Sequence, residues 1–168
     1  ACPPRQAQLE PPSPASQPAS QPSPHQDALD RVSAVHGAAG PWAVAGYRMG
    51  EKALEVFGLQ RGALELEVIH HTPRAVQYAC MADGASAATG ATAGKLNLTV
   101  KDADAANLRT TFVDRRNGKS ITFKPAPGFE ARFLNLPRDA SAQAGKTVMA
   151  LPEAAVFVLE DLSGSVTR

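Results

Sequence analysis

The chain is organised around residues 80–98, whose sequence is CMADGASAATGATAGKLNL. The first part of this stretch has almost no bulky side chains, so a helix formed here can pack closely against another backbone. Asp83 follows Cys80 by three residues and would share its face of that helix. A glycine-rich turn and the strand-like sequence Lys-Leu-Asn-Leu come next. We therefore expect a short buried helix with a thiol and a carboxylate, preceded and followed by strands.

The composition of this helix allows two interpretations. It is either a tightly packed core helix with no further role, or a functional helix, because an unpaired carboxylate inside a core is costly and needs a partner. A phosphate-binding loop at residues 90–95 is excluded. Three residues separate Gly90 from Gly94, whereas the P-loop pattern needs a longer spacing and a Ser or Thr after its lysine.

Length and charge limit the classes of function. The chain has 168 residues, of which 43% are hydrophobic, and this is enough for one domain with a core. The net charge of +1 gives no electrostatic footprint for a nucleic-acid partner. No apolar run approaches the roughly 18 residues of a membrane span. With one cysteine in the N-terminal tail and one in the domain, no disulfide framework is expected.

Residues 1–24 are predicted to be a tail, and residues 25–168 the domain. Eight of the fourteen prolines fall in the tail, separated mainly by Ser, Gln and Ala. A segment of this composition cannot bury enough apolar surface to offset the cost of ordering, so we expect it to be extended and solvated. As polyproline II, at about 3.1 Å per residue, it would reach about 70 Å.

Cys2 follows a small residue and precedes this Pro/Ser/Gln-rich spacer, as the acylated cysteine of a bacterial lipoprotein does. We expect Cys2 to carry the lipid, so that the domain is anchored to a membrane on the periplasmic side of the bacterial cell envelope. The alternative interpretation is a fragment whose cysteine has no such role. The mass of the native protein distinguishes the two.

Periodicity and turn signals predict the elements of the domain. Asp27 would cap a first helix, Pro41 would begin a second that ends at Gly58, and His36 would lie in the loop between them. Further elements are predicted as strands at 64–72, 76–78, 96–101, 111–115, 120–124 and 154–159 and a helix-like segment at 129–136. The sum is an α+β domain with a mainly antiparallel sheet and a few helices.

Two details of this sheet bear on the site. Asn117-Gly118 is the strongest hairpin signal in the chain, and a two-residue turn there would place Phe112 opposite Phe123. His70 and His71 are neighbours in one predicted strand and therefore point to opposite faces. At most one of these two histidines can serve a given site.

Two motifs in the domain are specific enough to indicate a family. The opening motif combines His36-Gly37 with Gly40-Pro41 and then with Gly-Tyr-Arg-Met at 46–49. The second motif runs without a gap, and its matching residues are Cys80, Asp83, Thr89, Gly90, Thr92, Gly94, Lys95, Asn97 and Leu98. Over about residues 30–125, the chain resembles the FmdE family, which is named after a formylmethanofuran dehydrogenase.

The resemblance implies a compact α+β domain, often a dimer, with a metal site, commonly zinc, near the histidines and cysteines of these motifs. In the opening motif, the second histidine is Ala38 and the cysteine is Gly40 in this chain. In the second motif, Ser86 replaces a glutamine and Ala91 replaces a cysteine. We therefore expect a relative that has lost part of the site.

His36, Cys80 and Asp83 remain from the polar set that the resemblance implies. Zinc accepts imidazole, thiolate and carboxylate ligands in four-coordinate sites, and His71, or else His70, would supply the fourth. These donors favour zinc or copper over magnesium or calcium. The hypothesis requires that the three side chains converge on one cleft. The alternative is a vestigial cleft in which His36 caps a helix and Cys80 is an inert buried thiol.

An enzyme that uses Cys80 is a further alternative. At a helix N-terminus its thiolate would be stabilised by the terminal N–H groups, and His36 would act as its base. The sequence shows no recognisable oxyanion device or substrate pocket. We therefore expect an envelope-tethered binding domain, with a non-catalytic accessory subunit of a larger membrane-associated complex as the alternative function. A homodimer is among the expected states.

Overall fold

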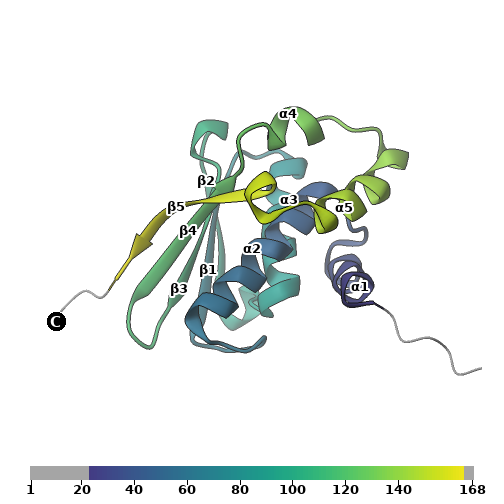
Figure 1. Ribbon diagram of the computed structural model, residues 1–168. Helices are drawn as coiled ribbons and strands as arrows, with labels where there is room; N and C mark the ends of the chain where they lie inside the picture. Colours follow the sequence, from purple (N-terminus) through teal and green to yellow (C-terminus); the bar gives the residue numbers. More distant parts are fainter. Residues whose placement is uncertain (1–22, 165–168) are drawn as a thin grey trace, which may run out of the picture.

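The computed structural model describes residues 23–164, which form one five-stranded sheet with helices packed on one face (Figure 1). The helices are α1 (Pro24–His36), α2 (Pro41–Phe57), α3 (Val76–Thr89), α4 (Phe129–Phe133) and α5 (Ser141–Ala150). The strands are β1 (Leu66–Thr72), β2 (Leu98–Asp102), β3 (Arg109–Asp114), β4 (Lys119–Pro125) and β5 (Phe157–Ser163). Residues 1–22 of the predicted tail, with the acylation of Cys2, fall outside the described residues. Helix α1 begins at Pro24 with Ser23 as its N-cap, so the prediction that Asp27 caps it is wrong.

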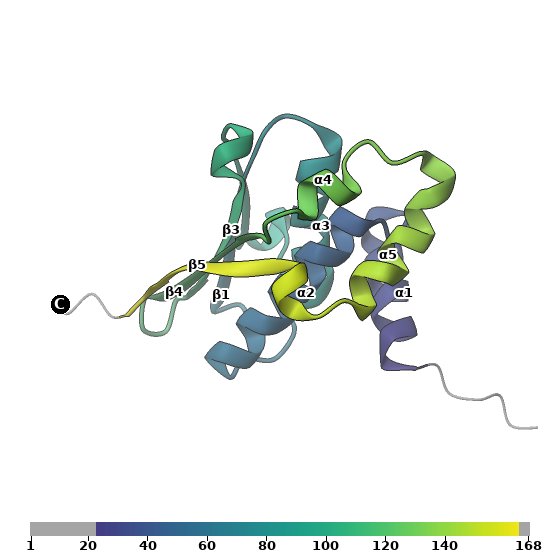
Figure 2. The ribbon, with the colours of Figure 1, turned by 45° about the horizontal axis from the view of Figure 1, so that its top comes forward.

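The order of the strands is β2-β1-β3-β4-β5, and only β1 and β2 run parallel to each other. The predicted α+β fold with a mainly antiparallel sheet is therefore confirmed. Figure 2 shows that α1, α2, α3 and α5 gather on the same side of the sheet. No helix of the described residues lies on the other side, which we call the outer face. None of these helices has the length and apolar character needed to cross a membrane.

Helices α2 and α3 pack with almost no space between their backbones, as the small residues of the central stretch predict. A Cβ added to Gly46 would overlap the carbonyl group of Met81, and one added to Gly84 would overlap the carbonyl group of Ala43. Because only glycine fits at these crossing points, the sequence of α3 fixes its distance from α2. Gly90 then ends α3 in the left-handed conformation, with a φ of 75°.

Two predicted elements differ from the structure, and one helix was missed. Residues 76–78 are the first turn of α3 and not a strand, because so short an apolar run fits either element and here continues the helix. The last strand begins at Phe157, after a 3₁₀ helix at Glu153–Ala155. Helix α5 was not predicted. Its apolar positions are few, and its buried residues are Gly145, Val148 and Met149.

The hairpin between β3 and β4 forms, but with a longer turn than predicted. Asp114 is fully buried, and its carboxylate accepts hydrogen bonds from the backbone and guanidinium of Arg116 and from the Asn117 side chain. This anchor keeps residues 115–118 outside the ladder, so Phe112 pairs with Ile121 instead of Phe123. The two phenylalanine rings still meet edge to face, with centroids 6.1 Å apart.

His70 and His71 point to opposite faces of the sheet, as predicted. His70 is fully buried beneath the helices, with Nδ1 2.9 Å from Thr110 Oγ1 and Nε2 3.0 Å from the Tyr78 carbonyl oxygen. Burial lowers the pKa of His70 to about 4, so this imidazole is neutral and belongs to the core. His71 lies on the outer face, between Lys101 of β2 and Arg109 of β3.

Candidate functional site

His36 is the last residue of α1 and not part of the following loop. Its Nδ1 lies 2.8 Å from Oδ2 of Asp83 on α3. When the imidazole is neutral, Nδ1 donates its proton to this carboxylate, and Nε2 is left as an acceptor. The Asp83 side chain is 49% exposed and that of His36 22% exposed, so the expectation of a buried carboxylate is wrong. The carboxylate fixes the orientation of His36 and still reaches solvent.

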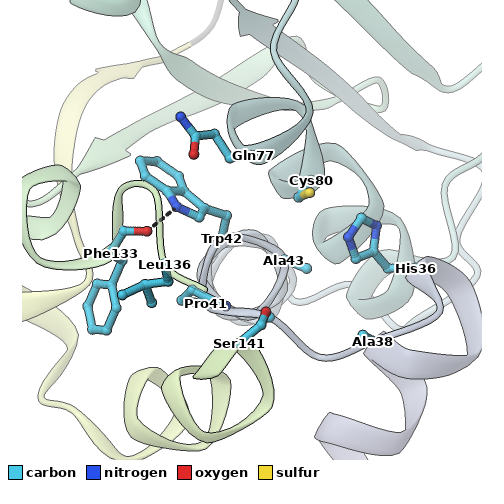
Figure 3. Close-up of a pocket in the computed structure, with 11 residues that line it drawn as sticks. His36, Ala38, Pro41, Trp42, Ala43, Gln77, Cys80, Phe133, Leu136 and Ser141 are labelled. Carbon is cyan, nitrogen blue, oxygen red and sulfur yellow. Dashed lines mark hydrogen bonds between the residues drawn. The ribbon is translucent and has the colours of Figure 1, made fainter. Parts of the chain in front are cut away.

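A cavity of about 150 Å³ lies beside His36, between the C-terminal end of α1, the N-terminal ends of α2 and α3, and the segment that leads from α4 to α5 (Figure 3). Most of its wall is apolar, and the residues that form this part are Ala38, Gly40, Pro41, Trp42, Ala43, Phe133 and Leu136. The polar side chains at its wall are His36, Gln77, Cys80 and Ser141. The cavity is therefore a small apolar hollow with a few polar groups.

Cys80 faces this cavity from the second turn of α3 (Figure 3). The expectation that it lies at a helix N-terminus is wrong, because α3 begins four residues earlier, at Val76. Its thiol donates a hydrogen bond to the carbonyl oxygen of Val76, at 2.9 Å. Burial, together with the negative charge of Asp83, raises the pKa of Cys80 to about 11. The thiol therefore keeps its proton at neutral pH and is a weak nucleophile.

The structure brings three of the four predicted ligand residues together. His36 and Cys80 line one cavity, and Asp83 binds His36. His71 does not join them, because it lies on the outer face of β1, across the sheet from the helices that enclose the cavity. His70 points toward the helices, but both of its nitrogens already have partners in the core.

These residues do not fit a closed zinc site. Among residues 23–164, no group of three or more His, Cys, Asp or Glu side chains is arranged to hold a metal ion. Structural zinc sites use four protein ligands and catalytic ones three. Asp83 contacts Nδ1 of His36, so it occupies the place of a partner that orients the imidazole. Cys80 would also have to lose a proton that its surroundings retain.

The changed positions of the opening motif line the same cavity. Ala38 and Gly40 stand where the family resemblance implies His and Cys, and both belong to the wall. A Cβ added to Gly40 would lie 2.7 Å from the hydroxyl oxygen of Ser141. Ser141 therefore occupies the space that a longer side chain at position 40 would need.

Sequence reasoning did not find most of the wall. Trp42 is the only tryptophan of the chain, and its indole Nε1–H donates to the Phe133 carbonyl oxygen at 3.0 Å. This bond ties the start of α2 to the end of α4 and closes one side of the cavity. The only signal in the sequence that could have indicated the cavity was this single tryptophan near a predicted helix start. The tertiary fold brings the other wall residues beside it, among them Phe133, Leu136 and Ser141.

The comparisons with known proteins agree with the motifs. The family model described as "FmdE, Molybdenum formylmethanofuran dehydrogenase operon" matches residues 35–158, a range that includes every residue of the cavity wall. A search of curated proteins found no match. Because the matched range covers well over half of the chain, the protein belongs to the FmdE family.

Proposed function

We propose that this chain is a binding domain whose cavity takes a small organic ligand with an apolar body and one hydrogen-bond donor. One observation carries the proposal: an apolar hollow of about 150 Å³ has at its wall an imidazole that a carboxylate holds in place. Nδ1 of His36 is engaged by Asp83. Nε2 is then the nitrogen available to a ligand, and it accepts a hydrogen bond from an O–H or N–H group of that ligand.

The size of the cavity limits the ligand. An apolar cavity of about 150 Å³ accommodates benzene, whereas pockets for larger ligands measure about 300–1,000 Å³. The ligand, or the part of it that enters, therefore has about the bulk of one six-membered ring. Trp42 and Phe133 offer ring faces and edges for its apolar body.

A transition-metal ion such as zinc or copper is the second candidate. It is supported by the contact of Asp83 with Nδ1 of His36, because metal-binding imidazoles often have such a carboxylate partner. It is the weaker candidate, since Cys80 retains its proton and the described residues supply no complete donor set. Elemental analysis of the purified protein tests it, with His36→Ala and Cys80→Ala as controls.

We also propose that Cys2 anchors the domain in the bacterial envelope, on the periplasmic side. The support is its position before a Pro/Ser/Gln-rich spacer. The spacer joins the domain at the start of α1, whereas His36 is at its end, about 18 Å away for a helix that rises 1.5 Å per residue. The proposed attachment point is thus at the opposite end of α1 from the cavity, whether the domain acts alone or as an accessory subunit. An intact mass with an unmodified Cys2 would contradict the anchor.

The ligand proposal is tested with phenol and toluene, which share a ring and differ in the hydroxyl group. The indole N–H of Trp42 gives the only tryptophan side-chain signal in a ¹H–¹⁵N spectrum. We expect phenol to shift this signal saturably and to bind about three- to tenfold more tightly than toluene, the value of one hydrogen bond.

His36→Gln should reduce the preference for phenol, whereas His25→Gln, an exposed histidine in the first turn of α1, should leave it unchanged. The proposal fails if neither compound shifts the signal. It fails equally if His36→Gln and His25→Gln give the same preference.

A further inference from the structure

The outer face of the sheet carries a row of basic side chains that the cavity does not involve. His71 of β1 pairs directly with Lys101 of β2 and with Arg109 of β3, so the three side chains are cross-strand neighbours. Adjacent strands lie about 4.8 Å apart. Lys101 and Arg109 each face the imidazole of His71 from a neighbouring strand, so their positive charges lie on one face of the sheet and attract a counter-charge.

The described residues supply that counter-charge only in part. Glu160 of β5 is the carboxylate that reaches the row, with Oε2 3.5 Å from Nη1 of Arg109. This distance is long for a charge-assisted hydrogen bond, and the same carboxylate also lies 4.0 Å from Nζ of Lys124. Lys101 is exposed and has no ion pair within residues 23–164. The nearby Asp102 is engaged by Arg74.

The imidazole of His71 is also incompletely satisfied. Its Nδ1 is buried without a hydrogen-bond partner among the described residues, so Nε2 is the nitrogen that a ligand can reach. Burial lowers the pKa of His71, and the charges of Arg109 and Lys101 lower it further. Burial and these neighbours therefore disfavour a positive charge on the ring. The row thus presents a polar imidazole between two cations.

We propose that Lys101, His71 and Arg109 form a binding site for a phosphate group on the outer face of the sheet. A phosphate carries up to two negative charges and three oxygens, which match two cations and one imidazole donor. Arginine supplies a fork of N–H donors, and lysine a compact charge. A carboxylate, with one charge and two oxygens, would leave part of the row without a partner.

The phosphate group has two sources to distinguish, a soluble phosphate ester and a phospholipid headgroup. Both offer the same chemistry to the row, and no helix of residues 23–164 lies over this face in Figures 1 and 2. The site lies across the sheet from the cavity, so the two do not share a residue. Failure of one proposal therefore leaves the other untouched.

The experiment is a titration with inorganic phosphate at constant pH and ionic strength, followed in ¹H–¹⁵N spectra of the whole chain. We expect saturable shifts of the amide signals of residues 71, 101 and 109. Lys101→Gln should weaken binding about two- to fivefold, as for an exposed ion pair. Lys146→Gln, an exposed lysine on α5, is the matched control and should have no effect.

Sodium acetate tests the class of anion, and the proposal is overturned if acetate binds at these residues as tightly as phosphate. It is also overturned if phosphate causes no saturable shift, or if the Lys101→Gln and Lys146→Gln variants bind phosphate equally well.

Sedimentation with phosphatidylglycerol vesicles separates the two sources of the phosphate group. Binding that Lys101→Gln weakens assigns the site to a headgroup, and phosphate binding without vesicle binding assigns it to a soluble ester.

Discussion

The two ends of α3 belong to one sequence motif, yet they differ in how their polar groups are used. Toward the N-terminal end, Cys80 lines the cavity, and Asp83 one turn later holds the imidazole of His36, which also lines it. At the C-terminal end, the hydroxyl of Ser86 donates to the Ala91 carbonyl oxygen, and the ammonium of Lys95 donates to the Gly90 carbonyl oxygen. We call these the open end and the closed end of α3.

A glycine-rich turn with a lysine therefore need not bind a ligand. Asn97 completes the closed end, because its side chain accepts a hydrogen bond from Thr92 N–H and donates one to the Leu66 carbonyl oxygen. The polar side chains named here bind backbone groups of the turn and, through Asn97, of β1. The proposed ligand site is at the open end, where most of the cavity wall is apolar.

The largest effect is expected where α3 crosses α2, between the two ends. Gly84→Ala would place a methyl group on the Ala43 carbonyl, and the backbones would have to separate. We expect a loss of about 3 kcal/mol or more in the free energy of unfolding, measured with urea. Gly94→Ala, in the closed end, is the control because open space surrounds that glycine. Equal stability of the two variants would contradict the close packing.

Acid should destabilise the fold through His70, which binds the Tyr78 carbonyl in the first turn of the open end. Its folded-state pKa of about 4 is below the unfolded value near 6.5, so the unfolded chain takes up the proton more readily. The contribution of this neutral imidazole is complete above about pH 6.5 and is lost as the pH falls toward 4. We expect the loss to be on the order of 3 kcal/mol. A His70 Hε1 resonance that titrates near pH 6.5 in the folded protein would refute this.

Removing Asn97 should damage the closed end without affecting the open one. Asn97 is 1% exposed, and its loss leaves the Leu66 carbonyl and the Thr92 N–H without these partners. Asn97→Ala should therefore cost about 2 kcal/mol of unfolding free energy, while the affinity for phenol stays at the wild-type value. Asn107→Ala, at an exposed position, serves as the reference. If the folded Asn97→Ala variant no longer binds phenol, the claim that only the open end of α3 serves the ligand is wrong.

Asp83→Ala should do the reverse of Asn97→Ala: it should lower the affinity for phenol and have the smallest effect on stability of these variants. The pair with His36 is partly exposed, so we expect a change below about 1 kcal/mol in urea unfolding. The imidazole would lose the partner that orients it, and phenol affinity should fall about three- to tenfold. If the variant is strongly destabilised and binds phenol normally, Asp83 is a structural residue.

The sequence was sufficient for the features that depend on local pattern. The small residues of α3, the start of α2 at Pro41 and the opposite orientations of His70 and His71 follow from composition and periodicity. The contact of His36 with Asp83 was expected only in outline, as convergence on one cleft. Its geometry makes Asp83 a partner of the imidazole, a role that residue type alone does not reveal.

Other features depend on contacts between segments far apart in the sequence. Phe133 and Ser141 reach the cavity through the turn between α4 and α5, which has no strong local signal. The register of the hairpin depends on the burial of Asp114, which lengthens the turn around Asn117-Gly118. The absence of a complete set of metal donors within the described residues became visible only when His71 was placed on the outer face.

The central claim is that the open end of α3 holds a small organic ligand instead of a metal ion. A crystal of the purified protein soaked in phenol, with data collected at the zinc absorption edge, tests it most directly. The account predicts a phenol ring between Trp42 and Leu136, its hydroxyl group on Nε2 of His36, and no anomalous peak. An anomalous peak that joins His36 and Cys80, or a cavity without phenol, would contradict it.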